Sequence, residues 1–192
     1  MTFVAPPPAA AWRHVDAREG FESVFFGRGP SGVRIEGRTC AIEDGHVWDV
    51  GYVIDADPEW RSMAARIRGR TVDGAVERVI ESTGGGRWRV DGRAAPHLDG
   101  CLDIDLESSA CTNTLPVHRL GLRRGDQAEA PAVYVRALDL AVERLDQTYR
   151  RIEDGTGQRY DYAAPIFGVA CVLAYDGSGL IVDYPGIASR VG

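Results

Sequence analysis

The sequence contains no lysine, and each of its 22 basic residues is an arginine. Schiff-base chemistry, attachment of pyridoxal phosphate and the phosphate-binding P-loop all depend on a lysine ammonium group, which a guanidinium does not replace. The chain also lacks the GxSxG and HExxH motifs of many hydrolases and zinc proteases. These absences exclude several large enzyme classes, and we expect no cofactor.

Targeting signals and metal-binding cysteine patterns are absent as well. The N-terminus has neither a basic stretch nor a long apolar run before the prolines at 6–8, and no later segment reaches about eighteen consecutive apolar residues. The four cysteines form no CxxC pair, which argues against a zinc site. We expect a cytoplasmic protein with reduced cysteines, no bound metal and no stable membrane insertion.

Composition and charge are those of one globular domain. The chain has 192 residues, 44% of them hydrophobic and 26% charged, which is enough to bury a substantial core. Twenty-eight acidic residues against 22 basic ones give a net charge of −6, so no overall positive field attracts nucleic acid. The expected division is a flexible Pro-rich N-terminus over residues 1–11 and a single β domain over residues 12–192.

Turn signals recur along the chain, and the runs between them have strand character. Alternating or β-branched residues separated by Asp-Gly and Gly-Gly pairs are typical of successive hairpins. The pattern is clearest over residues 32–56, which contain Asp44-Gly45, and a final hairpin is expected where residues 167–175 and 180–184 flank Asp-Gly-Ser-Gly. Further turns are expected at residues 27–30, 84–86, 91–92, 125–126 and 154–155.

Two stretches fit both a helix and a strand. Over residues 57–68, Met63 and Ile67 share one face of a helix, whereas Met63, Ala65 and Ile67 share one face of a strand. Residues 133–149 show the same ambiguity. Hydrophobic spacing alone does not decide between the two interpretations.

The segment that most suggests chemistry is Cys-Leu-Asp-Ile-Asp-Leu at residues 101–106. On a strand, Asp103 and Asp105 project from one face and the apolar residues between them pack on the other. Two carboxylates at this spacing are able to act as an acid–base pair, but they are too few for calcium, which takes about 6–8 oxygen ligands. The alternative is a half-solvated strand whose acids pair with arginines.

Polar residues that follow this strand extend the candidate set. Arg119 is suited to hold a carboxylate or phosphate through two parallel hydrogen bonds, and surface pairing is its alternative. Thr-Asn-Thr at residues 112–114 closes a turn more often than it binds a ligand. The four histidines are scattered at no recognised spacing for metal binding or Cys-His catalysis.

A family resemblance appears in two segments, GCLDIDLESSACTNTLPVHRL at residues 100–120 and VDYPGIASRV at residues 182–191. They are similar to signature segments of a bacterial family, the putative glycolipid-binding proteins, formerly a domain of unknown function. The resemblance extends from about Trp12 to the C-terminus. The chain departs from the family pattern at residues 109–111 and 117–118, where we expect changes in a local turn rather than in the fold.

The resemblance implies an antiparallel, partly open β-barrel with few helices, similar to that of bacterial lipoprotein carriers. Such a barrel has a concave face able to hold an acyl chain. On this fold both ambiguous stretches become strands. The resemblance implies no catalytic residue.

These observations lead to one hypothesis with two alternatives. The hypothesis is non-enzymatic binding of an apolar or amphipathic small molecule, such as a glycolipid, in the concave face of the curved sheet, because an open barrel leaves an apolar trough. One alternative is a hydrolase or isomerase that acts on a sugar or lipid through Asp103 and Asp105 with Asn113 and Arg119. The other is an interaction module. The predicted ligand-binding residues are Asp103, Asp105, Asn113, Arg119 and Tyr184.

Overall fold

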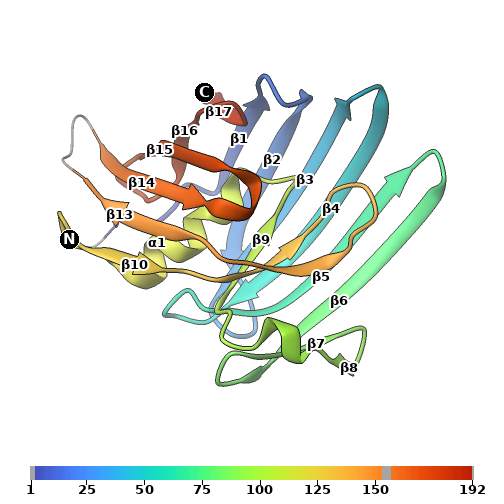
Figure 1. Cartoon of the computed structure of the whole chain (residues 1–192), viewed down its shortest axis with the longest axis horizontal. Coiled ribbons are helices and arrows are strands. Elements are labelled where there is room, and N and C mark those ends of the chain that lie inside the picture. Colours follow the sequence, from blue (N-terminus) through green and yellow to red (C-terminus); the bar gives the residue numbers. More distant parts are fainter. Residues whose placement is uncertain (1–2, 153–156, 192) are drawn as a thin grey trace.

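The computed structural model describes residues 3–152 and 157–191. Within them, fourteen strands form one large antiparallel sheet, and three form a smaller one. The strands of the large sheet, in their order across it, are β10 (Gln127–Glu129), β13 (Thr148–Arg151), β14 (Gln158–Ala164), β15 (Val169–Tyr175), β16 (Ile181–Tyr184), β17 (Ala188–Val191), β1 (Ala9–His14), β2 (Glu19–Arg28), β3 (Val33–Glu43), β4 (His46–Ala56), β5 (Ser62–Thr71), β6 (Gly74–Gly84), β7 (Arg87–Val90) and β8 (Arg93–Ala94). The sheet curves, and β10 and β8 are its edges among the described residues, so the expected partly open barrel is confirmed (Figure 1).

The smaller sheet and the helices complete the fold. The small sheet has the order β12 (Val142–Leu145), β11 (Ala132–Val135) and β9 (Asp103–Leu106). The helices are η1 (Pro96–Leu98), η2 (Cys111–Asn113), α1 (Thr114–Leu120) and η3 (Pro165–Phe167), of which only α1 is an α-helix within the described ranges. No helix in the described part of the chain is both long and apolar enough to cross a membrane.

The predicted hairpins form where the sequence contains residues that favour tight turns. Asp44 and Gly45 have φ values of 48° and 79°, which suits the two-residue turns that match the twist of paired strands. In the β3–β4 hairpin that they join, alternate side chains of β4 from Trp48 to Ala56 are buried. The final hairpin is also confirmed, as β15 and β16. The turn predicted at residues 154–155 lies outside the described residues.

Both ambiguous stretches are largely extended, as the family resemblance implies. Most of residues 57–68 belongs to β5, which pairs with β4 on one side and β6 on the other. Residues 57–61 form a turn, in which the Asp57 carboxylate accepts hydrogen bonds from the backbone N–H groups of Glu59 and Arg61. Residues 133–149 contribute to three strands. Pairing on two sides supplies more hydrogen bonds and packing than an isolated helix in this stretch would gain.

Several local features differ from the expectation. Helix α1 occupies part of a segment expected only to turn, and Pro116 is accommodated because it lies in the first turn, where its missing N–H has no intrahelical acceptor. Gly121, with a φ of 54°, ends the helix. Strands β9 and β11 pair in parallel. Strand β1 begins at Ala9, within the segment expected to be flexible.

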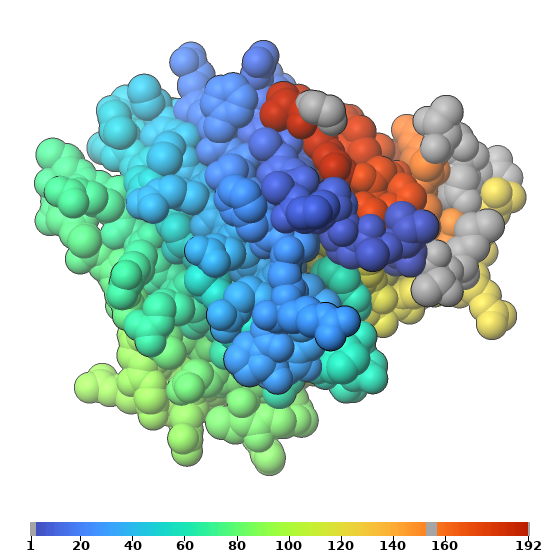
Figure 2. All heavy atoms as spheres, turned by 180° about the vertical axis from the view of Figure 1, so that it is seen from behind, coloured from blue at the N-terminus to red at the C-terminus, as the bar shows by residue number. Residues whose placement is uncertain are grey.

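The concave side of the large sheet is occupied by the segment that carries the signature residues. Figure 1 shows α1 and β9 in the middle of the molecule, between the two wings of the sheet. The backbone oxygen of Ser108 accepts a hydrogen bond from Thr39 on one wing, and that of Asn113 accepts one from Tyr175 on the other. The expected open trough is therefore filled, while the N-terminal strands, blue to green, form much of the opposite surface (Figure 2).

Candidate functional site

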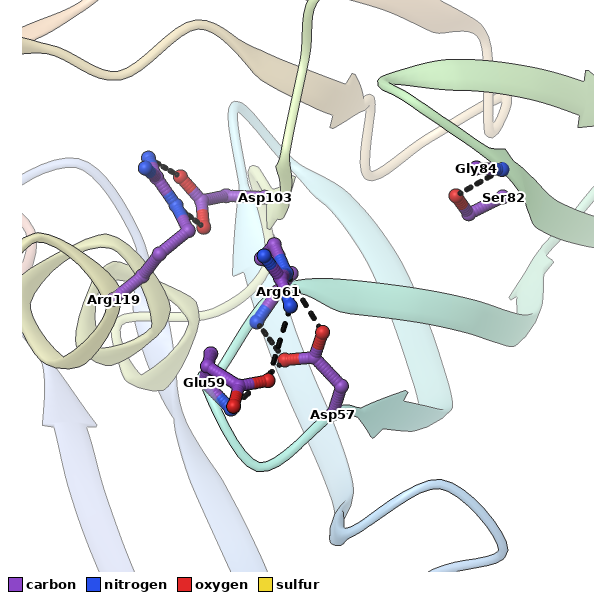
Figure 3. Close-up of polar contacts among 7 residues, drawn as sticks. All are labelled: Asp57, Glu59, Arg61, Ser82, Gly84, Asp103 and Arg119. Carbon is purple, nitrogen blue, oxygen red and sulfur yellow. Dashed lines mark hydrogen bonds and ion pairs between the residues drawn. The ribbon is translucent and has the colours of Figure 1, made fainter.

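The two acids of β9 are buried rather than half-solvated, because β9 lies inside the barrel. Asp103 is fully buried and Asp105 is 6% exposed. Arg119 reaches from α1 to Asp103 and donates two hydrogen bonds to its carboxylate, with Nε–Oδ1 and Nη2–Oδ2 distances of 2.9 and 2.6 Å (Figure 3). The arginine and one of the two acids are thus committed to each other.

A second arginine near β9 is also paired. Arg61, in the β4–β5 turn, donates hydrogen bonds to the carboxylates of Asp57 and Glu59 (Figure 3). Both arginines in this region therefore have carboxylate acceptors other than Asp105.

Asp105 has a different environment from its neighbour on β9. Thr112 Oγ1 donates a hydrogen bond to Oδ1 at 2.8 Å, and the backbone N–H of Leu106 lies close to the carboxylate. The pKa of Asp105 is raised to about 6, mainly by burial and also by the nearby carboxylates of Asp103 and Glu107, against the opposing effect of the hydrogen bonds. Asp105 is therefore a buried carboxyl group that titrates near neutral pH.

A cavity of about 240 Å³ lies beside Asp105. It is found at the end of the barrel where the β1–β2, β3–β4, β14–β15 and β16–β17 turns meet the inner segment, since alternate turns of an antiparallel sheet lie at the same end. The residues that line it are Ala17, Arg18, Glu43, Asp105, Leu106, Glu107, Ser109, Asn113, Tyr134, Leu145, Tyr162, Ala164, Phe167, Val169, Tyr184 and Ile187.

Aromatic rings form much of the cavity wall. The ring centroids of Tyr134 and Phe167 are 5.3 Å apart, and those of Tyr162 and Tyr184 are 5.9 Å apart in an edge-to-face arrangement. Burial raises the pKa of Tyr162 and Tyr184, so their hydroxyl groups remain protonated hydrogen-bond donors at neutral pH. The wall therefore offers both apolar ring faces and polar groups.

The structure brings together three of the five predicted binding residues. Asp105, Asn113 and Tyr184 all line the cavity, whereas Asp103 and Arg119 form their ion pair outside its lining. The sequence analysis did not identify two further tyrosines of the lining, Tyr134 and Tyr162. One signal was present: the Tyr-x-Tyr spacing at residues 160–162 places two rings on one face of a strand.

Three charged residues other than Asp105 line the cavity: Arg18, Glu43 and Glu107. Arg18 is 6% exposed and donates a hydrogen bond to the backbone oxygen of Glu107 at 2.8 Å. Its Nε lies 3.6 Å from a carboxylate oxygen of Glu43. Its guanidinium also lies over the ring of Trp48, 5.3 Å from the centroid.

Trp48 lines a larger, open depression of about 1100 Å³ at the same end of the barrel. The depression lies between the β3–β4 and β5–β6 turns and contains none of the five predicted binding residues. Large apolar side chains on its border are exposed to solvent: Ile42, Val47, Val72 and Leu138. Arg18 thus lines the small cavity and contacts Trp48, which lines the open apolar depression.

The described residues contain no group of three or more His, Cys, Asp or Glu side chains arranged to hold a metal ion. We expect addition of EDTA to change the melting temperature by less than about 1 °C, because a chelator lowers stability only where a metal site contributes to folding, and the described residues form no such site. Differential scanning calorimetry with and without the chelator measures this. A decrease of several degrees would reveal a bound cation.

Comparison with known proteins supports the family resemblance. A family model described as "Putative glycolipid-binding" matches residues 9–190. A crystal structure of a DUF1089 family protein from Pseudomonas aeruginosa has 29% sequence identity and a TM-score of 0.80, over 100% of this chain and 97% of that one. The fold is shared by a beta-barrel-like protein of domain of unknown function DUF1849 from Brucella abortus. That protein has 13% sequence identity and a TM-score of 0.56, over 98% of this chain and 96% of that one. No curated protein matches the chain significantly.

Proposed function

The chain belongs to the family described as "Putative glycolipid-binding", and from that membership and the cavity at Asp105 we propose that it binds an amphipathic small molecule, such as a glycolipid, without catalysing a reaction. The cavity carries this proposal. Its volume of about 240 Å³ is below the range of about 300–1,000 Å³ that is typical of sites for drug-sized ligands. It therefore takes the headgroup of the ligand and not its whole length.

The lining of the cavity suits a polar headgroup. Asp105, Asn113 and Tyr184 supply hydrogen-bonding groups, and Phe167 and Val169 supply apolar contacts. A site that combines a few fixed polar groups with apolar walls orients its ligand through the former and excludes water through the latter.

The acyl chain lies outside the cavity in this proposal. It passes Arg18 and follows the apolar border of the depression, where Ile42, Val47 and Val72 are exposed. Burial against such a surface stabilises a chain by about 0.8 kcal/mol per methylene group. The exposed apolar side chains at this end of the barrel are thereby explained as part of the binding surface.

A binding role is favoured over the hydrolase or isomerase alternative by the geometry of the predicted residues. Asp103 and Arg119 hold each other through two hydrogen bonds and do not line the cavity. Only Asp105 and Asn113 of that proposed set face the ligand space. A cytoplasmic location belongs to the same proposal, since the four cysteines are all free thiols.

Two neighbouring residues of β15 provide a matched test. Val169 lines the cavity, whereas Ala170 lies on the exposed face of the same strand. We expect Val169→Trp to weaken binding of dodecyl maltoside by about ten-fold or more, because the indole occupies the headgroup space, and Ala170→Trp to change it by less than about two-fold. Isothermal titration calorimetry below the critical micelle concentration measures both. Equal affinities for the two variants would place the binding site elsewhere.

A further inference from the structure

We propose that the headgroup bound beside Asp105 carries an ammonium group, so that the ligand is a cationic amphipath. The inference rests on the proposed function, because it assigns a charge to the headgroup that the same cavity takes. Two independent features carry it: the distribution of ion pairs around the cavity and the arrangement of its aromatic walls.

The first feature is that Asp105 is the only carboxylate lining the cavity, within residues 3–152 and 157–191, that has no cationic group paired with it. Glu43 lies 3.6 Å from Arg18, and Glu107 lies 3.4 Å from Arg136. The groups close to the Asp105 carboxylate are neutral donors and two further carboxylates. Among the described residues its charge is therefore stabilised by neutral hydrogen-bond donors and is not paired with a cation.

Asp103 shows how the other buried carboxylate on this strand is compensated. It lies two residues from Asp105, is as deeply buried, and has Arg119 in a bidentate ion pair. A buried charge without such compensation is costly, since neither water nor a counter-ion stabilises it. An ammonium group on the ligand would pair with the carboxylate of Asp105 as the guanidinium of Arg119 pairs with that of Asp103.

The second feature is the set of aromatic rings around the cavity. Tyr134 and Phe167 form one corner, and Tyr162 and Tyr184 form another. Aromatic faces attract organic ammonium groups, and cages of such rings recognise them in other proteins. The rings of the first corner already attract a cation, because the guanidinium of Arg136, which does not line the cavity, lies 6.0 Å from the Tyr134 centroid and 5.6 Å from that of Phe167.

Charge also disfavours the opposite kind of headgroup. A phosphate or sulfate in the cavity lies among the carboxylates of Asp105, Glu43 and Glu107, and the one arginine that lines the cavity, Arg18, already faces Glu43. Like charges in a desolvated site repel strongly. Arg119, which sequence reasoning assigned to anionic headgroups, is occupied by Asp103.

The experiment compares single-chain amphipaths that differ only in the headgroup. Isothermal titration calorimetry at about pH 7.5 uses dodecyltrimethylammonium, dodecyl maltoside and dodecyl sulfate, each below its critical micelle concentration, with tetramethylammonium as a headgroup without a chain. We expect the cationic amphipath to bind about ten-fold or more tightly than the neutral one, and the anionic one to bind most weakly. Tetramethylammonium is expected to bind at least about ten-fold more weakly than its dodecyl derivative.

Two variants test whether Asp105 is the source of the preference for the cationic amphipath. Asp105→Asn is expected to bring the affinities for the cationic and neutral amphipaths to within about two-fold of each other, because it removes the charge and keeps the shape. Asp161→Asn changes the net charge equally but alters a side chain on β14 that is half-exposed and lies 3.8 Å from Arg150. This control is expected to retain the full preference of the wild type.

The outcomes separate this inference from the proposed function. Equal binding of the neutral and cationic amphipaths by the wild type overturns the ammonium assignment and leaves amphipath binding intact, as does a preference for dodecyl sulfate. A cation preference that survives in Asp105→Asn also overturns it. If tetramethylammonium binds as tightly as its dodecyl derivative, the ligand is a free ammonium compound and not an amphipath. If none of the probes binds, the proposed function itself fails.

Discussion

At about pH 8, the Asp105→Asn variant is expected to be more stable than the wild type by about 3 kcal/mol, and near pH 4 the difference should disappear. The carboxyl group is buried, and its pKa is about 6, compared with an ordinary value of 3.8. Above that pKa the wild type must keep a buried carboxylate ionised. Asparagine has no such cost and still offers an oxygen to the hydroxyl group of Thr112.

The sign of this stability difference, and its increase with pH, follow from the linkage between protonation and folding. A group that binds its proton more tightly in the folded state contributes stability below its unfolded pKa, and this contribution is lost as the pH rises through the folded pKa. For Asp105 the loss falls between about pH 4 and pH 6. The other titratable groups close to it are carboxylates and tyrosines: Asp103, Glu107, Tyr134, Tyr149, Tyr162, Tyr175 and Tyr184.

Urea unfolding of the wild type and the variant at about pH 4 and pH 8 measures the effect. The Asp161→Asn variant is the control, because its side chain is half-exposed, and it should differ from the wild type by no more than about 0.5 kcal/mol at either pH. If Asp105→Asn is the less stable protein at the higher pH, the carboxylate is compensated within the fold. Groups with perturbed pKa values that lower stability are frequent at functional sites. A more stable Asp105→Asn variant would therefore support a role of Asp105 in ligand binding.

The strands of the hairpins were predictable because their determinants are local. Asp44 and Gly45 specify a tight turn, and the alternation in β3 and β4 then places one face of each strand in the core. The parallel pairing of β9 with β11 joins residues about thirty positions apart in the sequence. No local pattern encodes it, because the contact forms only when the intervening segment folds back inside the barrel.

The candidate site was predictable only in part for the same reason. Asp105 stood out because two acids alternate with apolar residues, but the sequence does not distinguish it from Asp103. The difference arises from Arg119, which a helical turn of the chain delivers to Asp103 alone. The cavity tyrosines come from three further strands, so their convergence is a property of the barrel and not of any one segment.

Strand β2 shows how tertiary contacts reverse a sequence pattern. Alternation of hydrophobic residues would place Phe21 and Phe25 in the core, yet they are 53% and 60% exposed, whereas Glu22 between them is fully buried. The Glu22 carboxylate accepts hydrogen bonds from Tyr52 Oη at 2.6 Å, from Ser109 Oγ, and from the backbone N–H groups of residues 110 and 111 at 2.8 and 3.3 Å. One acidic side chain thus fixes the inner segment to the wall of the barrel.

Replacement of Glu22 by alanine is therefore expected to destabilise the protein by about 4 kcal/mol or more, because it removes the acceptor that four buried donors share and opens a cavity. Glutamine should cost about 2 kcal/mol, since its amide oxygen still accepts the two backbone hydrogen bonds, while its NH₂ group faces the hydroxyls of Tyr52 and Ser109, which lose the carboxylate as acceptor. Glu36→Ala, on the exposed face of β3, is the control and should remain within about 0.5 kcal/mol of the wild type.

Chemical unfolding of the three variants at neutral pH ranks these effects. Binding of dodecyl maltoside to any folded Glu22→Ala protein adds a second readout, because two residues that line the cavity, Ser109 and Asn113, lie within two residues of the backbone groups that Glu22 holds. We expect affinity to fall together with stability, since the same carboxylate positions the segment that contributes Ser109 and Asn113 to the cavity lining. A Glu22→Ala variant that is as stable as Glu36→Ala would mean that apolar packing and the hydrogen bonds from Thr39 and Tyr175 hold the inner segment in the barrel without Glu22.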